Sequence, residues 1–141
     1  MVSGRWTSAG LIDTLDPARA AHWQRNAQAC PRTTAVLARV AGLQVGGFLR
    51  MAPGTRLHPH ADLQDPRFLN FMLALSGGEH AWLRVGTQHH RHRDGTCIVF
   101  DPRVEHEAGN DGGVDRVTLY AAVAIHAVHL PLGGIASPSR T

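Results

Sequence analysis

The residues of this chain best suited to chemistry are two histidines and an aspartate, His60, Asp62 and His106. One residue separates His60 from Asp62, and side chains at i and i+2 of an extended strand leave the same face. A neutral imidazole and a carboxylate on one face supply two ligands of a metal site, and His106 is the best candidate for the third. Two histidines and one carboxylate on one face of an octahedron are the ligand set of non-haem Fe(II) oxygenases.

A structural role for the same residues is the alternative, with His60 and His106 as hydrogen-bonded core histidines and Asp62 as the cap of a turn. Arg116 favours the metal site, because it enters an apolar strand, where an arginine is costly unless it is paired. Its planar guanidinium suits the distal carboxylate of a dicarboxylate that chelates iron through its other end, which points to 2-oxoglutarate. A buried Asp or Glu partner for Arg116 is the other possibility.

The remaining histidines of the ten in the chain are weaker candidates. His58 alternates with His60 and is a candidate substrate-facing residue, although Pro59 between them disturbs the simple alternation of a strand. Three more histidines precede the Asp94-Gly95 turn, and we interpret them as a solvated hairpin end rather than a second metal site: His89, His90 and His92.

The elements that must position these residues are read from the apolar pattern. Asp16-Pro17 is typical of a helix start, and the helix it opens runs through Ala29. A second helix is expected from about Thr33 to Gly42. Short apolar runs separated by turn residues then predict strands over 44–51, 55–60, 68–75, 80–86, 96–100, 105–109 and 115–126. The N-terminal 15 residues are expected to hold one short strand near Leu11.

Seven or so antiparallel strands behind two helices describe a jelly roll, a mainly β, cupin-like fold with two buttressing N-terminal helices. At 141 residues the chain fits one domain. Within it we expect an arm and helix over 1–29, the β domain over 30–128 and a flexible tail over 129–141.

Composition excludes several function classes. All 14 basic residues are arginines, which points to a GC-rich bacterial source, and the formal charge is +3. The arginines are scattered singly and aromatic residues are few, so no nucleic-acid partner is expected. No segment reaches the ~18 apolar residues that a membrane span requires, so no membrane partner is expected either. Two cysteines and no leader-like N-terminus favour a reduced, cytoplasmic protein.

Four separated motifs resemble the aspartyl/asparaginyl β-hydroxylase family of Fe(II)/2-oxoglutarate dioxygenases. The motifs are Cys30-Pro-Arg-Thr-Thr34, Met51-Ala-Pro-Gly-Thr55 leading to Pro59-His60, Val99-Phe100-Asp101, and Glu105-His106-Glu107 followed by Asn110 and Arg116. The resemblance extends from about residue 30 to 126 and implies a double-stranded β-helix. It also implies that His60 and His106 bind iron and that Arg116 binds the 5-carboxylate of 2-oxoglutarate, with O₂ as the second cosubstrate.

Two sites in the sequence distinguish this chain from some or most other members of that family. Some members have glycine two residues after the first histidine, whereas lipid-hydroxylating and other bacterial relatives keep an acid there, so we assign Asp62 to the triad. Where the family usually has Arg-x-His-Leu-Gly-Leu, this sequence has Asn70-Phe-Met72-Leu-Ala-Leu. The charges that would hold a substrate carboxylate are lost, which argues against aspartate or an aspartyl peptide. Arg84 and Arg67 are candidate replacements, and Asn70 and Met72 remain candidate substrate contacts.

These observations predict an oxygenase that hydroxylates a C–H bond of a small amino-acid-like, peptidyl or carrier-linked substrate. A non-catalytic, cupin-like metal- or ligand-binding module is a different class of protein that the loss of the 70–72 charges would favour. A metal-dependent isomerase or oxygenase without a cosubstrate would keep the triad but have no use for Arg116. The oligomeric state is not predicted.

Overall fold

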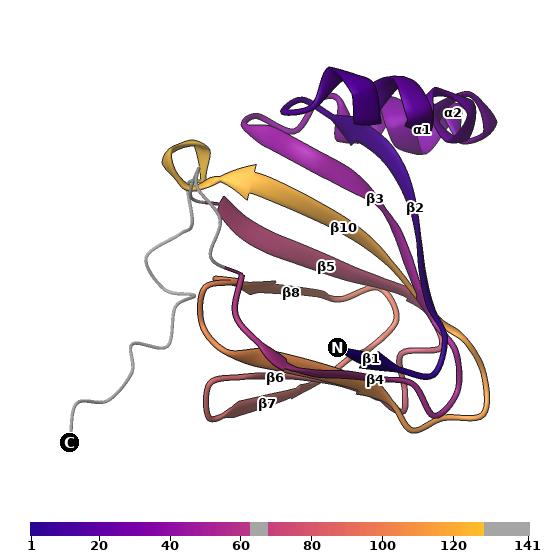
Figure 1. Ribbon diagram of the computed structural model, residues 1–141, viewed down its shortest axis with the longest axis vertical. Helices are drawn as coiled ribbons and strands as arrows, with labels where there is room; N and C mark the ends of the chain where they lie inside the picture. Colours follow the sequence, from indigo (N-terminus) through magenta and orange to yellow (C-terminus); the bar gives the residue numbers. More distant parts are fainter. Residues whose placement is uncertain (63–67, 129–141) are drawn as a thin grey trace.

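The computed structural model describes residues 1–62 and 68–128, which form two facing antiparallel sheets and two helices (Figure 1). One sheet has the strand order β1 (Val2–Ser3), β4 (Arg56–His60), β9 (His106–Asn110), β6 (Ala81–Val85) and β7 (Gln88–Arg91). The other has the order β2 (Trp6–Asp13), β3 (Leu43–Met51), β10 (Arg116–Ala124), β5 (Phe68–Ser76) and β8 (Cys97–Phe100). The helices are α1 (Pro17–Ala29) and α2 (Pro31–Leu37), and a 3₁₀ turn, η1 (Ile125–Ala127), follows β10.

This arrangement confirms the predicted jelly roll with two helices. Figure 1 shows the two sheets converging where β10 begins and lying further apart where it ends. The non-sequential order of the strands within each sheet is what a double-stranded β-helix produces, because most successive strands cross from one sheet to the other.

The N-terminal segment is more ordered than the sequence predicted. In place of a short strand near Leu11, β2 spans Trp6–Asp13 and pairs with β3, while β1 pairs with β4. Residues 1–13 thus complete both sheets, and the predicted boundary between residues 29 and 30 does not separate an arm from the β domain. The predicted tail over 129–141 lies outside the described residues.

Helix α1 begins as its sequence predicts, because the Asp16 carboxylate accepts hydrogen bonds from the amides of Ala18 and Arg19, with Pro17 in the first turn. The helix is held against β2 by Trp23, whose ring covers Gly10 so closely that a β-carbon there would lie 2.1 Å from a ring atom. The second helix starts earlier than predicted, at Pro31, because proline is well suited to a first helical turn.

Two apolar clusters hold the fold together. One lies where α2 meets the outer surface of the second sheet, and Leu37, Leu43 and Val123 are buried there. The other fills the space between the sheets around Met51, Leu83 and Ala108. No helix within residues 1–62 and 68–128 has both the length and the apolar character needed to cross a bilayer.

Candidate active site

His60 and His106 are direct partners across the antiparallel pair of β4 and β9. Directly opposed residues on one face of such a pair bring their β-carbons to about 5 Å, and here the ring centroids are 4.3 Å apart. The register shifts between Leu57 and His60, so β4 carries one extra residue relative to β9. This bulge turns both Leu57 and His60 toward the interior, where Leu57 lies beside Ala108 and His60 beside His106.

The two imidazoles are held in the same tautomer. Nδ1 of His60 lies 2.8 Å from the carbonyl oxygen of His58, and Nδ1 of His106 lies 2.9 Å from that of Val104. A carbonyl oxygen only accepts, so each Nδ1 carries the proton and each Nε2 keeps a free lone pair. Backbone carbonyls that fix the ring orientation in this way are typical partners of metal-binding histidines.

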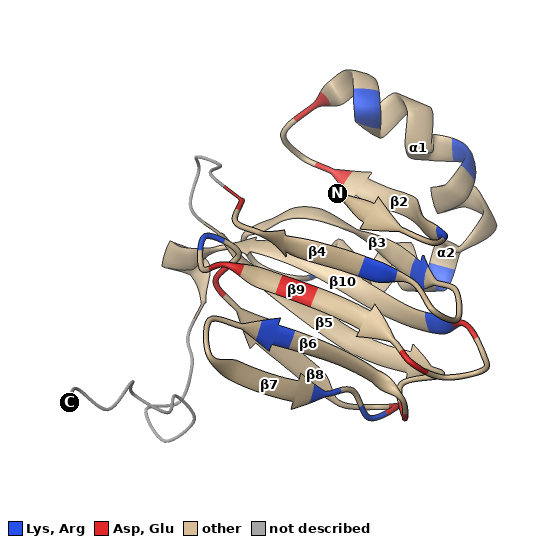
Figure 2. Cartoon of the chain, turned by 60° about the horizontal axis from the view of Figure 1, so that its bottom comes forward, with Lys and Arg blue, Asp and Glu red and all other residues tan. Residues whose placement is uncertain are grey.

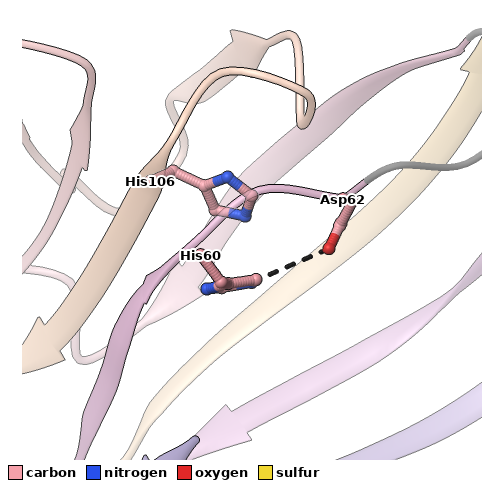
Figure 3. A group of neighbouring side chains, drawn as sticks. All are labelled: His60, Asp62 and His106. Carbon is pink, nitrogen blue, oxygen red and sulfur yellow. Dashed lines mark ion pairs between the residues drawn. The ribbon is translucent and has the colours of Figure 1, made fainter.

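Asp62 completes a three-residue cluster with these histidines (Figure 3). Its carboxylate lies 3.8 Å from Nε2 of His60, and one ligand atom from each of the three residues lies within 4.8 Å of the others. The backbone amide of Asp62 donates to the carbonyl oxygen of Pro102 at 2.8 Å, which anchors the segment that leaves β4. His106 is buried and packs on Phe100, whereas His60 and Asp62 are partly accessible. A cation that entered the cluster would meet three suitable donors and one compensating negative charge.

The cluster lines a cavity of about 470 Å³ between the sheets. Arg116 also lines it and is only 2% exposed. Within the described residues Arg116 forms no ion pair, and its Nε has no hydrogen-bond partner. The expected alternative of a buried Asp or Glu partner is therefore absent there. Burial without a counterion lowers the pKa of Arg116 to about 10, and the guanidinium remains charged at neutral pH.

His92 is a cavity residue that the sequence interpretation assigned to a solvated hairpin end. It is 1% exposed, lines the same cavity as Arg116, and its Nε2 lies 3.4 Å from Nη1 of Arg116. The reason is a turn at Gly86, where φ is +55°, which splits the predicted strand 80–86 from β7. His90 pairs with Leu83 in the resulting hairpin, and the His92 amide donates to Ala81, so His92 follows the inward-facing side.

The other predicted site residues divide into two groups. Asn70 and Met72 project from β5 into the cavity, as expected of substrate contacts, and neither carries a charge. His58 does not line the cavity, because the bulge in β4 leaves it exposed on the other side.

Arg84 does not reach the cavity either. It forms ion pairs with Glu107 and Glu105 and donates to the carbonyl oxygen of Gly86. Figure 2 shows this basic segment of β6 beside the acidic segment of β9. Arg84 is thus no replacement for the lost cation of β5. The other candidate replacement, Arg67, lies outside the described residues.

The donor set fits a divalent cation together with a carboxylate ligand. Imidazole and carboxylate ligands with open positions suit Fe(II) among the common metals. Among the described residues, Nε of Arg116, which lines the cavity, and Oγ1 of Thr118 are buried without partners, and Thr118 lies two residues from Arg116 on the same face of β10. Unpaired donors beside a buried cation match an anionic oxygen group.

Comparisons with known structures agree with the fold. The chain is similar to a predicted oxalate decarboxylase from Thermotoga maritima, with a TM-score of 0.55 and 13% identity over 88% of this chain and 84% of that one. It is also similar to the cupin domain of Cnp3 from Schizosaccharomyces pombe, with a TM-score of 0.58 and 10% identity over 89% of this chain and 69% of that one. At such identities these likenesses concern the fold alone.

Sequence comparison gives a more specific result. Over 99 residues, or 69% of this chain, the sequence is 28% identical to the ornithine lipid ester-linked acyl 2-hydroxylase of Rhizobium tropici, and it spans 35% of the length of that relative. The sequence model of one family, described as aspartyl/asparaginyl beta-hydroxylase, matches residues 2–125, which include both sheets, the two histidines, Asp62 and Arg116. The chain therefore belongs to the aspartyl/asparaginyl β-hydroxylase family.

Proposed function

We propose that this protein is an Fe(II)- and 2-oxoglutarate-dependent oxygenase that hydroxylates an unactivated C–H bond. The observation that carries the proposal is the cluster of His60, Asp62 and His106 in one cavity with Arg116, which has no counterion among the described residues. With iron bound, the site would supply the reaction of 2-oxoglutarate, O₂ and a C–H bond to succinate, CO₂ and an alcohol.

Each protein group has a defined part in this proposal. Nε2 of His60, Nε2 of His106 and the Asp62 carboxylate would hold the metal. The carbonyl oxygens of His58 and Val104 keep both imidazoles in the metal-binding tautomer before the metal arrives, so little reorganisation accompanies binding. Arg116 would bind the distal carboxylate of 2-oxoglutarate, because its guanidinium is charged, buried and free of any counterion in the described chain.

The apolar walls of the cavity would exclude water from the reacting atoms. Leu57, Leu83 and Ala108 lie on the β4–β9–β6 side, with Met51 opposite them in the same cluster. A dry site strengthens every charge interaction inside it and suppresses side reactions of the activated oxidant.

For the substrate we propose an acyl group carried by a larger molecule, such as a lipid or a carrier. Asn70 and Met72 present no cation to a substrate carboxylate, while Phe68 and Leu49 add apolar surface to the same cavity. The acyl 2-hydroxylase from Rhizobium tropici, which shares 28% identity over 99 residues, supports this substrate class.

The direct test is succinate formation from 2-oxoglutarate by protein reconstituted with Fe(II) in air. We expect turnover that increases when an ornithine lipid is added, together with a product heavier by the mass of one oxygen atom. Under anaerobic conditions, Fe(II) and 2-oxoglutarate together should give a weak visible charge-transfer band. Absence of both the band and succinate at saturating metal and 2-oxoglutarate would contradict the proposal and favour a non-catalytic module or a cosubstrate-independent reaction.

A further inference from the structure

The cavity extends from the cluster of two histidines and an aspartate to the edge strand β2 of the second sheet. Trp6 and Ser8 of β2 pair directly with Met51 and Leu49 of β3, and all four residues line the cavity. Direct partners in an antiparallel pair lie on the same face, so these side chains form a continuous row on the inner surface of the sheet. A strand of eight residues such as β2 extends over about 25 Å, which gives the row the length to contact an extended ligand.

Helix α1 continues this row where the first sheet provides no strand. The first sheet ends on this side with β1, which has only two residues, whereas β2 runs on toward the helices (Figure 1). Trp23 of α1 packs on Gly10 of β2, and Trp23 and Leu15 both line the cavity. Together, the large apolar side chains on this side of the cavity form a surface that we call the β2 wall: Trp6, Leu15, Trp23, Val45 and Leu49.

The β2 wall offers a ligand apolar surface without a free charge. Among the described residues, the charged side chain of the cavity on this side is Arg19, and its guanidinium forms an ion pair with Asp13. Asp13 also accepts hydrogen bonds from the amides of Leu15 and Asp16, so both charges are already compensated. Trp6 and Leu15 nevertheless remain 38% and 48% exposed. Large apolar side chains that stay exposed at a cavity are typical of a binding surface for an apolar ligand.

The β2 wall leaves the proposed cosubstrate site free. Arg116 of β10 and Trp6 of β2 both pair with Met51 of β3, from opposite sides of that strand. Neighbouring strands lie about 4.8 Å apart, so the backbones at Arg116 and Trp6 are separated by roughly 10 Å across the sheet. A cosubstrate held at Arg116 and a chain on the β2 wall can therefore lie side by side in one cavity that also includes the cluster.

We propose that the β2 wall binds the unbranched hydrocarbon chain of the acyl substrate, with the chain extended along β2 and the C–H bond to be oxidised at the cluster. This inference rests on the proposed function and deepens it, because it gives the acyl chain a place in the cavity and makes chain length a determinant of specificity. A hydrocarbon is the ligand that gains most from such a wall, since contact removes apolar surface of both partners from water.

The first test measures how affinity depends on chain length. Uncharged N-methylamides of straight-chain acids, from hexanoyl to dodecanoyl, are titrated into protein that holds Mn(II) and 2-oxoglutarate without O₂. Burial of one CH₂ group corresponds to a factor of about four in affinity, so the affinity should rise by about that factor for each added carbon that reaches the wall. A dissociation constant that does not change with chain length would overturn the proposal.

Fluorescence locates the bound chain. A bromine atom on the chain quenches a tryptophan that it touches, and Trp6 and Trp23 belong to the β2 wall. Trp82, the third tryptophan, is the matched control, because it does not line the cavity and its indole N–H donates to Asp111. A brominated decanoyl amide should quench the wild type and Trp82→Phe, and the double variant Trp6→Phe, Trp23→Phe should lose this quenching. Quenching that persists in the double variant would place the chain elsewhere and overturn the proposal.

A larger side chain at Ser8 should shorten the chain that the protein accepts. Ser8 lies on the inner face of β2, so Ser8→Trp would fill part of the space beside the wall. We expect the affinity for the dodecanoyl amide to fall roughly tenfold, the equivalent of one to two buried CH₂ groups, while the hexanoyl amide and 2-oxoglutarate bind as before. Thr7→Trp is the matched control, because Thr7 lies on the opposite face of β2 and outside the cavity.

The outcomes separate this inference from the proposed function. If 2-oxoglutarate binds but Ser8→Trp accepts the dodecanoyl amide as well as Thr7→Trp does, the β2 wall is not the chain site and the oxygenase proposal stands. If the amides bind with the expected length dependence and 2-oxoglutarate does not bind, the oxygenase proposal fails and the β2 wall remains a chain-binding site. A dimer in sedimentation that excludes the amides would assign the wall to a second copy of the protein and overturn the inference.

Discussion

Replacement of Arg116 by methionine should make the ligand-free protein more stable while it removes the contribution of the distal carboxylate to 2-oxoglutarate binding. Each pH unit by which burial lowers the pKa of Arg116 corresponds to about 1.4 kcal/mol, so a fall from the ordinary value to about 10 places the cost of the buried cation on the order of 3 kcal/mol. Because the folded-state pKa lies below the unfolded one, this cost is fully present at neutral pH and fades only above about pH 10.

Methionine keeps most of the side-chain volume but gives up the hydrogen bond to Nε2 of His92, which costs about 1 kcal/mol. The net gain in unfolding free energy should be about 1–2 kcal/mol, in line with other replacements of buried ions by apolar residues. For a domain of this size, that gain corresponds to a rise in Tm of roughly 3–8 °C.

Thermal unfolding with and without ligand measures both effects. Wild-type protein with Mn(II) should gain about 2.7 kcal/mol from 2-oxoglutarate at a hundred times its Kd, whereas Arg116→Met should gain nothing from the distal carboxylate. The order of stability of the two proteins would then invert when the ligand is added. A ligand-free Arg116→Met that is less stable than the wild type would show that Arg116 has a structural partner, and the reasoning from its unpaired burial would be wrong.

Three further predictions concern the cluster, the substrate and the ion pair of Asp13 with Arg19. Asp62→Ala should lose Fe(II) affinity and coupled turnover as His106→Ala does, with a normal Tm, and a loss of only about 1 kcal/mol in stability with intact iron binding would reduce Asp62 to a turn residue. Aspartate and aspartyl peptides should not stimulate succinate formation, because Asn70 and Met72 offer no cation, and stimulation would show that another cation serves them. Burial opposes the ionisation of Asp13, but hydrogen bonds from the Arg19 side chain and the amides of Asp16 and Leu15 outweigh it and lower the pKa of Asp13. Its contribution to stability is fully present above the ordinary carboxyl pKa of 3.8 and is lost as the pH falls below it, so Asp13→Asn should flatten the loss of stability below about pH 5 in urea unfolding.

The sequence predicted the class of fold and the cluster because both follow from local patterns. Alternating short runs and turn residues required a two-sheet β fold, and the His-x-Asp spacing placed His60 and Asp62 together at the end of one strand. His106 was the candidate third ligand, but its direct pairing with His60 across β4 and β9 was not predicted, since register between distant strands depends on the whole sheet.

The misassigned residues share a physical cause, the side of a strand on which they lie. One unrecognised turn at Gly86 moved His92 from a solvated hairpin end to the cavity. One extra residue in β4 removed His58 from the face it seemed to share with His60. Arg84 was a candidate because it is charged, yet it alternates with the inward-facing Leu83 and therefore lies on the opposite face. The positions of turns and bulges decide on which face of a strand a side chain lies, and neither leaves a strong signal in the local sequence.

The bulge in β4 also bears on how such proteins change over evolutionary time. Because β4 carries one extra residue between Leu57 and His60, both side chains face inward although they are three residues apart. A deletion of one codon between them would remove the bulge, bring the two residues to the regular two-residue spacing and leave the histidine opposite His106. The same sequence paired without the bulge would instead turn the His60 side chain to the opposite face of the sheet, and the barrel would keep its apolar interior and Arg116 but lose one member of the cluster. The number of residues in this segment and its pairing with β9 must therefore change together if the cluster is to persist.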